Sequence, residues 1–285
     1  MTITNTTTLN DLLPSIVAEA LFVASEKSIM RGLVRNYSLG AGQGKTVTVP
    51  IYPKVTAAAL TEATAPTFTA VSTDGAVLTV SEVGLTAQVS DLALMASSSN
   101  VVADIGRLFG EAVARKMDTD LMALFMALST STVGGVTTTA TPALIFQAIA
   151  KLRSQGYDTS NDCAIVLHPN VAYDVASVLT STFAAPASAI GNSALENGFM
   201  GMIGGVPVYQ SSLVPVETGG SAAGDYACAV FHKDAFGLAI MQDIRIESQR
   251  EATKRGFDIV GSAIYGVGEL YDAAGVRMIF DSSIE

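Results

Sequence analysis

The sequence predicts a mixed α+β protein with one dominant long helix and a compact α/β unit inserted before a strand-rich C-terminal segment. Apolar residues in 98–128 follow the helical period over about thirty residues. Residues 163–167 form the continuous apolar run of a strand covered on both faces. Residues 239–279 are mostly strand-like, and no internal repeat is present. Together these patterns indicate one mixed fold rather than a purely helical or purely β protein.

The N-terminal segment is predicted to begin with an amphipathic helix. Its apolar positions follow the 3.6-residue period: Leu9, Leu12, Leu13, Ile16, Val17, Ala20 and Leu21. The helical pattern fades near Gly32, and residues 39–44 are rich in glycine. A short strand is then expected at 46–49, ended by Pro50.

Residues 52–74 are predicted to form a long extended loop or hairpin. The segment is rich in Ala and Thr, contains Pro53 and Pro66, and keeps no sustained period. Asp74-Gly75 indicates a turn, and a strand is expected over 77–89. On one face of that strand we expect the side chains of Val77, Thr79, Ser81 and Val83. Loops of this length inside compact domains are usually functional.

The long helix is expected to start near Ser98-Ser99-Asn100 and to end at the Ser/Thr/Gly run after Leu128. Its predicted apolar stripe comprises Ile105, Leu108, Ala112, Leu121, Leu124, Phe125 and Leu128. Its predicted i,i+4 ion pairs are Arg107 with Glu111, Glu111 with Arg115, and Lys116 with Asp120. A helix of this length would extend roughly 40 Å.

The inserted α/β unit is predicted to open at Thr141-Pro142, a cap followed by proline at the first helical position. The elements expected after it are a helix at 144–153 ending at Gly156, the strand 163–167, a helix at 171–179, a tight turn at Ile203-Gly204-Gly205-Val206, and strands at 206–210 and 227–232.

Charge and composition limit the classes of function. The formal net charge is −10, so nucleic acid binding is not expected as the main task, because phosphate neutralisation needs clustered cations. Only 15% of residues are charged, against roughly 25% in ordinary domains. Burial against further copies of the chain would stabilise such a surface. An ordinary alanine-rich globular protein fits the composition as well, so composition alone does not decide between the two interpretations.

Membrane and secretory signals are not expected. The longest uncharged stretch, 121–150, is too polar to span a bilayer, and the N-terminus lacks a signal-peptide pattern. The protein is therefore expected to be made and kept in a cytoplasm. Cys163 and Cys228 are expected to be reduced, buried and structural.

The segment Gly40–Thr46 resembles a phosphate-binding loop. It is one residue short of the required pattern, because Leu39 stands where the first glycine should be. Val47-Thr48-Val49-Pro50 follows it, which predicts a strand instead of the helix that a phosphate site needs. A nucleotide site is therefore not favoured.

No other pattern indicates catalysis, a cofactor or a metal. His168 and His232 have no second ligand at metal-binding spacing, and no GxSxG motif occurs. Asp118 and Asp120 are two apart on a helix, so they do not share a face and do not form a carboxylate pair. We expect no catalytic, cofactor-binding or metal-binding residues, and no enzyme.

The order of the segments resembles that of tailed-bacteriophage major capsid proteins of the Hong Kong 97 type. The stretches that carry the resemblance are 111–120 at the end of the long helix, 164–170 and 205–211 in the inserted unit, and 265–271 with Gly275-Val276 near the end. Each motif is loose, and their order over nearly the whole chain makes the likeness specific.

This resemblance implies a shell subunit with five regions. They are an N-terminal arm with a helix (1–40), an extended E-loop hairpin with flanking strands (41–96), the spine helix of the peripheral domain (97–136), an inserted α/β axial domain (137–239) and the return strands of the peripheral domain (240–285). The candidate subunit-contact residues are Lys54, Glu62, Pro66, Phe68, Arg107 and Glu111.

The resemblance also implies partners and a location. Copies would meet as pentamers and hexamers in an icosahedral shell around phage double-stranded DNA, with weak non-specific DNA contact and no membrane. A separate scaffold protein, a portal and a possible decoration protein are expected. The chain would reside in the virion capsid after assembly in the cytoplasm of the bacterial host.

Some members of this family join a loop lysine to a neighbour's asparagine by an isopeptide bond. Lys45 and Lys54 lie in or beside the loop here, but no asparagine occurs after Asn197, where the return strands would supply it. We therefore predict a shell without covalent cross-links.

Three alternatives remain. An encapsulin-type nanocompartment shell protein would share the fold, although the long Ala/Thr-rich loop favours the phage protein. A cytoplasmic nucleotide-binding enzyme would use Gly40–Thr46. A phage tail-tube protein would be dominated by strands, which the long helix argues against.

Overall fold

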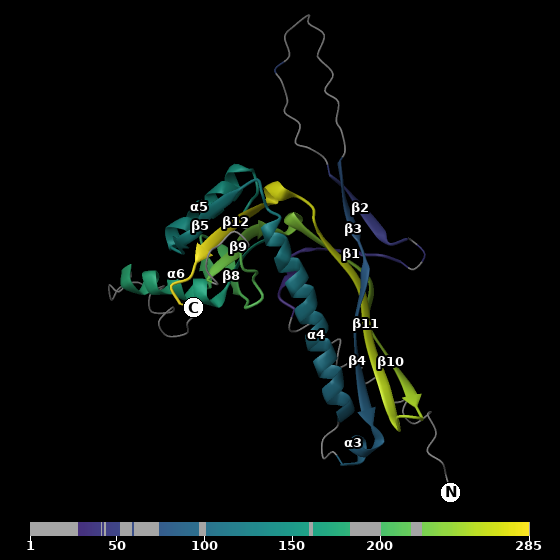
Figure 1. Ribbon diagram of the computed structural model, residues 1–285. Helices are drawn as coiled ribbons and strands as arrows, with labels where there is room; N and C mark the ends of the chain where they lie inside the picture. Colours follow the sequence, from purple (N-terminus) through teal and green to yellow (C-terminus); the bar gives the residue numbers. More distant parts are fainter. Residues whose placement is uncertain are drawn as a thin grey trace, which may run out of the picture.

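The computed structural model describes residues 28–40, 42, 44–51, 59, 74–96, 101–159, 162–182, 201–217 and 224–284. The N-terminal helix and most of the 52–74 loop, predicted from the sequence, lie outside these residues. The described chain contains two main sheets joined by the long helix α4 (Val101–Ala123), as Figure 1 shows.

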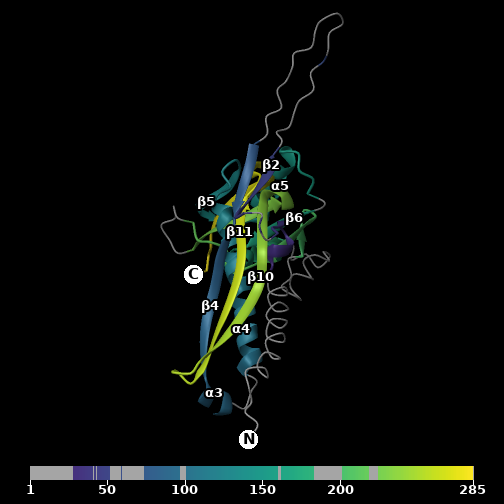
Figure 2. The same ribbon diagram turned by 90° about the vertical axis from the view of Figure 1, so that its right-hand side faces the viewer.

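The first sheet has four strands in the order β1-β10-β11-β4 and gives the molecule its elongated part. Its strands are β1 (Arg35–Ser38), β10 (Phe236–Glu251), β11 (Gly256–Glu269) and β4 (Ser81–Ser90). Figure 2 shows β4, β11 and β10 side by side along most of their length. The short α3 (Asp91–Ala96) follows β4.

The second sheet has six strands in the order β5-β12-β9-β6-β8-β7 and forms the compact part. Its strands are β5 (Thr132–Thr139), β12 (Gly275–Asp281), β9 (Asp225–His232), β6 (Cys163–Leu167), β8 (Val206–Gln210) and β7 (Met202–Ile203). Helices α5 (Pro142–Ser154) and α6 (Pro169–Thr182) belong to this part. All five residues of β6 are buried, as its apolar run predicted.

A separate pair, β2 (Thr46–Ile51) and β3 (Asp74–Thr79), flanks the loop. Short 3-10 turns complete the chain: η1 (Met30–Gly32), η2 (Leu124–Met126), η3 (Lys233–Ala235) and η4 (Asp272–Ala274).

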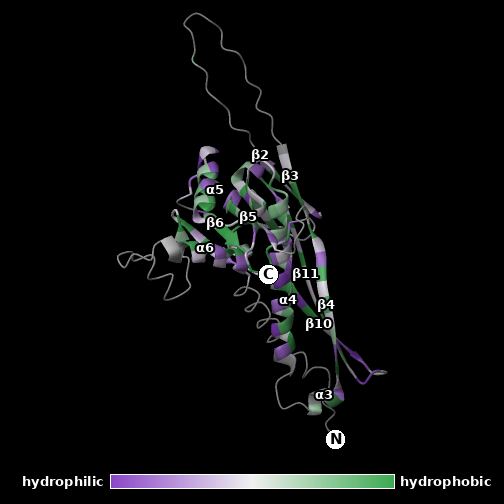
Figure 3. Ribbon diagram, turned by 60° about the vertical axis from the view of Figure 1, so that its left-hand side comes forward, coloured by the Kyte–Doolittle hydropathy of each residue, from purple (hydrophilic) through white to green (hydrophobic). Residues whose placement is uncertain are grey.

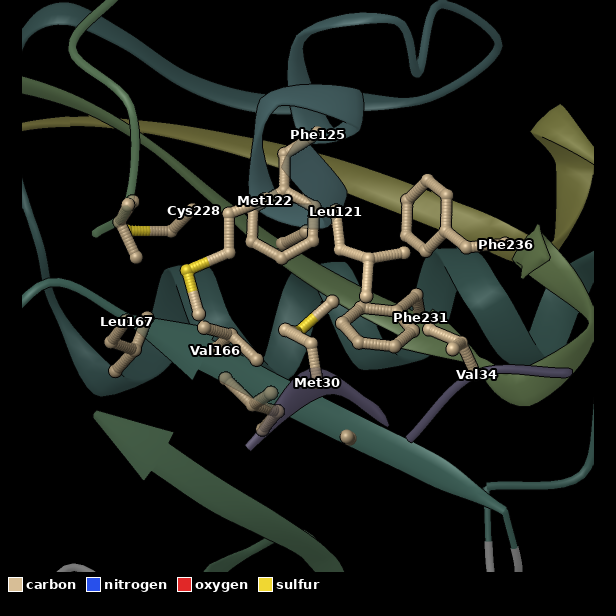
Figure 4. Close-up of a cluster of buried hydrophobic side chains, with 14 of the residues drawn as sticks. Met30, Val34, Leu121, Met122, Phe125, Val166, Leu167, Cys228, Phe231 and Phe236 are labelled. Carbon is tan, nitrogen blue, oxygen red and sulfur yellow. The ribbon is translucent and has the colours of Figure 1, made fainter. Parts of the chain in front are cut away.

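A hydrophobic core joins the compact sheet to the end of α4. Figure 4 shows side chains from α4, β6, β9, β10 and the η1 segment converging there. The rings of Phe125, Phe231 and Phe236 contact one another, with centroids 5.2–5.7 Å apart. The two parts of the molecule are therefore held by one continuous core.

Several local predictions are confirmed. α5 begins with Pro142 after Thr141, although the Thr141 side chain makes no capping hydrogen bond, and Gly156 follows the helix at φ +85°. Ile203 pairs with Val206 across Gly204 and Gly205, both at positive φ, as a two-residue hairpin turn requires. Lys116 and Asp120 form the predicted ion pair at 2.7 Å.

The predictions for residues 46–50 and 74–89 are wrong in three respects. Asp74 and Gly75 do not form a turn: they begin β3 and pair with Ile51 and Pro50. β2 continues through Pro50 because β3 is its only partner in the described chain, so the missing N–H can face away from the pair. The predicted single strand is split at Val80 into β3 and β4.

The split at Val80 also changes which side chains face inward. Before the break the even-numbered Leu78 is buried and Val77 is 58% exposed, whereas after it the odd-numbered side chains of β4 face the core. The strict alternation that grouped Val77 with Val83 on one face therefore does not hold across the break.

Two further predictions are corrected at the long helix and beyond it. Leu108 is 61% exposed, and the buried face runs instead through Ile105, Phe109 and Val113. The Ser/Thr/Gly run after Leu128, expected to be only a helix end, contains β5, which pairs in parallel with β12. The C-terminal segment 240–285 is thus divided, with β10 and β11 in the four-stranded sheet and β12 in the compact one.

Candidate assembly surfaces

The long helix covers one face of the four-stranded sheet. Ile105, Phe109 and Val113 of α4 belong to the same buried cluster as Ile259 and Ala263 of β11. The helix approaches β11 closely at Gly261, where an added Cβ would lie 2.6 Å from the ring of Phe109. At about 1.5 Å per residue, the 23 residues of α4 span roughly 35 Å. This packing makes the elongated part a two-layer unit.

Asp118 on α4 anchors residues 28–30, which precede β1 in the chain. Its carboxylate accepts hydrogen bonds from Ser28 Oγ (2.7 Å), Ile29 N (2.9 Å) and Met30 N (3.2 Å). Burial raises the pKa of the Asp118 carboxyl, while these three hydrogen bonds act in the opposite direction. Asp120, two residues on, instead accepts from the Tyr265 hydroxyl at 2.9 Å. The two carboxylates act separately, as predicted.

Two polar groups connect the end of the long helix to the compact sheet. Asp272 of η4 accepts hydrogen bonds from the backbone and hydroxyl groups of Ser129 and Thr130 at 2.6–2.9 Å. The guanidinium of Arg277 on β12 binds the carboxylate of Glu217 and donates to the Met126 carbonyl at 3.1 Å. These contacts fix the position of the compact part relative to α4.

The opposite face of the four-stranded sheet carries polar side chains in rows across the strands. Glu247, Val260 and Thr86 form one such row, and Gln249, Asp258 and Gln88 form the next. Gln88 donates to Asp258 at 2.7 Å, and Val260 is 40% exposed. Figure 3 shows hydrophilic colouring at the far ends of β10 and β11. At one end of the sheet Leu78 of β3 packs on this face, in a small buried cluster with Ala239 and Leu270, whereas the rows around Val260 are largely exposed.

Two small hollows lie on the described surface. A hollow of about 200 Å³ lies beside Asp162 and Lys233, and another of about 290 Å³ lies beside Thr86 and Asp258. Both are smaller than the roughly 300–1,000 Å³ of usual ligand pockets. Among the described residues, no group of three or more His, Cys, Asp or Glu could hold a metal ion. None of the described helices is long and apolar enough to cross a membrane.

The sequence contains histidines, cysteines and a glycine-rich segment that were considered as candidates for a chemical role. In the structure, those described below have the environments of structural residues. His168 stacks on Tyr226 with ring centroids 3.7 Å apart, and burial lowers its pKa. Burial raises the pKa of Cys163 to about 11 and that of Cys228 to about 12, so neither thiol is activated. The glycine-rich segment near Gly44 leads into the strand β2, not into a helix.

Of the candidate contact residues, Lys54, Glu62, Pro66 and Phe68 lie outside the described residues. Arg107 is exposed and Glu111 is half-buried; they lie one turn apart on α4, and neither is without a partner.

Sequence reasoning missed the anchoring role of Asp118 and the close approach at Gly261. Both depend on contacts between distant segments. Only the helical position of Asp118 on the same turn as buried apolar residues could have indicated that it is buried.

Comparison with known proteins identifies the family. The model of the family described as phage capsid protein matches residues 76–279. No curated protein sequence matches the chain.

Among solved structures, the chain is similar to the capsid of the cyanophage P-SCSP1u, with 16% identity, a TM-score of 0.69 and coverage of 90% of this chain and 89% of that one. It is also similar to the capsid of the Helicobacter pylori bacteriophage KHP30, with 12% identity, a TM-score of 0.71 and coverage of 90% and 91%. An encapsulin complex from Synechococcus elongatus PCC 7942 matches with 14% identity, a TM-score of 0.64 and coverage of 90% and 88%.

The structural likenesses establish the fold, and the family model covers most of the 285-residue chain. This chain therefore belongs to the phage capsid protein family and is a structural capsid protein with the Hong Kong 97-type fold.

Proposed function

We propose that copies of this chain assemble as pentamers and hexamers into the icosahedral head that encloses phage double-stranded DNA, and that the chain is not an enzyme. The observation that carries the proposal is the family match over residues 76–279. The exposed polar rows of the four-stranded sheet and the low charge of the chain support it, because both suit surfaces that become contacts between copies.

The proposal assigns each part of the chain to one domain of the capsid subunit. α4 with β4, β10 and β11 would form the peripheral domain, and β5 to β9 together with β12 would form the axial domain. This assignment follows the sheets, so it moves β5 and β12 relative to the boundaries expected from the sequence. Residues 41–96 would supply the E-loop and its flanking strands, and 1–40 the arm.

Within this arrangement, the loop residues Lys54, Glu62, Pro66 and Phe68 would contact a neighbouring copy. Arg107 and Glu111 on the exposed side of α4 would belong to a receiving surface, together with Leu108 between them. A scaffold protein, a portal and, in a shell that carries one, a decoration protein would be separate chains. DNA contact would be weak because the net charge is −10. Assembly would take place in the host cytoplasm.

Electron microscopy of the purified, overexpressed chain tests the proposal. Angular shells or curved sheets of hexamers are expected. Discrete small oligomers at every concentration and salt condition would contradict it. Denaturing gels of mature particles should show single subunits, since no asparagine follows Asn197, and a ladder of linked subunits would show that the shell is cross-linked.

An encapsulin-type compartment is the second candidate, favoured by the likeness to the Synechococcus elongatus encapsulin complex. The contents of particles isolated from the native source distinguish the two functions. Packaged double-stranded DNA supports the phage head, whereas a co-purifying enzyme with no DNA supports the compartment.

A further inference from the structure

The four-stranded sheet has two edges that differ in their protection against strand pairing. On the β10 side, β1 pairs with residues 237–240. Beyond that, the ladder of β10 shifts register between Ile240 and Arg245, and the exposed edge carries the charges of Arg245 and Glu247. Bulges and charges are the features by which natural sheets prevent unwanted pairing.

The β4 edge lacks these features. β4 pairs with β11 over ten residues without a register shift, from Ser81 with Tyr265 to Ser90 with Gly256. It contains no proline and only one charged residue, Glu82. β11 is the only strand that pairs with β4 in the described chain, so the other side of β4 is a long, regular and nearly neutral edge.

The register identifies the main-chain groups that point away from β11. The Asp91 N–H donates to the Arg255 carbonyl, and the same alternation continues along the ladder. Odd-numbered residues of β4 therefore bond to β11, and the even-numbered ones present their N–H and C=O groups at the free edge. The groups that have no main-chain partner in the described chain are those of Glu82, Gly84, Thr86 and Gln88.

We propose that β4 pairs in antiparallel register with β4 of a second copy, about a two-fold axis at Thr86. This inference rests on the proposed function, which brings many copies together. Pairing centred on Thr86 joins three of the four free positions to one another, Thr86 with Thr86 and Gly84 with Gln88, and it places the side chain of Glu82 opposite that of Ser90. No like charges face each other. An isologous contact must be self-complementary in this way.

The core-facing side chains fit the same register. Val83 would lie opposite Val89, and Leu85 opposite Ala87, so the partly buried and buried apolar row of one copy continues into the other. A two-fold axis perpendicular to the sheet keeps both α4 helices on the same face, and the polar face of each sheet remains on the other side. The result is one sheet that runs through two copies.

A cysteine at the axis tests the contact. The two native thiols are buried, so Thr86→Cys supplies a distinct exposed thiol. Opposed residues in such a pair have Cα atoms about 5.5 Å apart, within disulfide range. Oxidised particles of Thr86→Cys should give a linked dimer on non-reducing gels. The matched control is Val260→Cys, which lies in the same row one strand inward. Its two copies would be roughly 14 Å apart and should stay unlinked.

A charge exchange gives a second, independent test. Thr86→Lys and Thr86→Glu each place like charges opposite each other, so each should weaken dimer formation about two- to fivefold. An equal mixture of the two variants should restore it, because the charges then complement each other. Analytical ultracentrifugation of the variants and the mixture measures this.

The outcomes separate this inference from the proposed function. If shells form but Thr86→Cys stays unlinked in them, or if the mixture of charged variants associates no better than either alone, the pairing is wrong and the shell stands. If the cysteine links two copies but no shell forms under any condition, the pairing stands and the proposed function is wrong.

Discussion

The ring of Phe109 on α4 lies directly against the backbone of Gly261 on β11. A Cβ added at Gly261 would lie 2.6 Å from Cδ2 of Phe109 and 3.1 Å from Cε2. Because real side chains do not approach this closely, the absence of a side chain at Gly261 sets the separation of helix and sheet.

Gly261→Ala should therefore destabilise the chain by about 1–3 kcal/mol, as overpacking of a filled core does. Urea unfolding followed by circular dichroism measures the loss. The control is Gly135→Ala, whose Cβ would meet Thr138 Oγ1 at an ordinary 3.7 Å and should change stability little. Adding Phe109→Leu to Gly261→Ala should recover part of the loss, and no recovery would mean that the strain lies elsewhere.

Asp118 should matter more to stability than any exposed acid on the same helix. Asp118→Ala removes the acceptor for the Ile29 and Met30 N–H groups and leaves polar groups unsatisfied in a site where Asp118 is 3% exposed. Loss of hydrogen bonds to a buried charged acceptor should cost roughly 2–3 kcal/mol.

The measurements are the urea midpoint and the rate of trypsin cleavage after Arg31, which should rise as the segment detaches. Asp104→Ala, at an exposed position of α4, is the matched control. Equal effects of the two substitutions would show that Asp118 is no special anchor.

These two contacts also show where sequence reasoning stops. Local patterns predicted α5 with its proline start, the buried strand β6 and the Gly204-Gly205 hairpin, because each is set by neighbouring residues. Helical periodicity could not decide whether Leu108 or Phe109 faces the sheet, since both are apolar and adjacent. The space above Gly261 decides it, and that space comes from a strand about 150 residues away.

The strands β3, β4 and β5 were misjudged for a related reason. The break at Val80 arises because β3 pairs with β2 while β4 pairs with β11, so the inward face changes where the partner changes. β5 is rich in Thr and Gly and gains its strand form by pairing with β12, some 140 residues later. The free edge of β4 likewise follows from topology, which no local pattern contains.

Asp272 should make stability depend on pH in the acid range. Burial acts to raise its pKa, but the hydrogen bonds from Thr130 and Ser129 outweigh burial, and the pKa is lowered from the ordinary carboxyl value. A carboxyl whose pKa is lowered on folding stabilises the fold at pH above its unfolded pKa. This contribution is lost as pH falls through the folded pKa.

Asp272→Asn should therefore be less stable than the unmodified chain at pH 7, and the difference should shrink as the pH is lowered below about 4. Urea midpoints at pH 7, 5 and 3 measure this dependence. A difference that stays constant over this range would show that the charge of Asp272 does not contribute.

Arg277 and Glu217 should be strongly coupled because both are largely buried. Their side chains are only 18% and 9% exposed, and the Arg277 guanidinium also donates to the Met126 carbonyl. Glu217→Leu leaves the arginine charge without its partner inside the protein, which should cost about 3–5 kcal/mol. Arg277→Met with Glu217→Leu removes both charges and should cost less than the sum of the two single substitutions. The coupling free energy from the four urea unfolding curves measures the interaction.

An exposed pair, Arg245 with Glu247, provides the control. Each of these side chains is 63% exposed, so the coupling free energy of this pair should stay below about 1 kcal/mol. Equal coupling in the two pairs would mean that the contact between η2 and the compact sheet does not depend on burying Arg277.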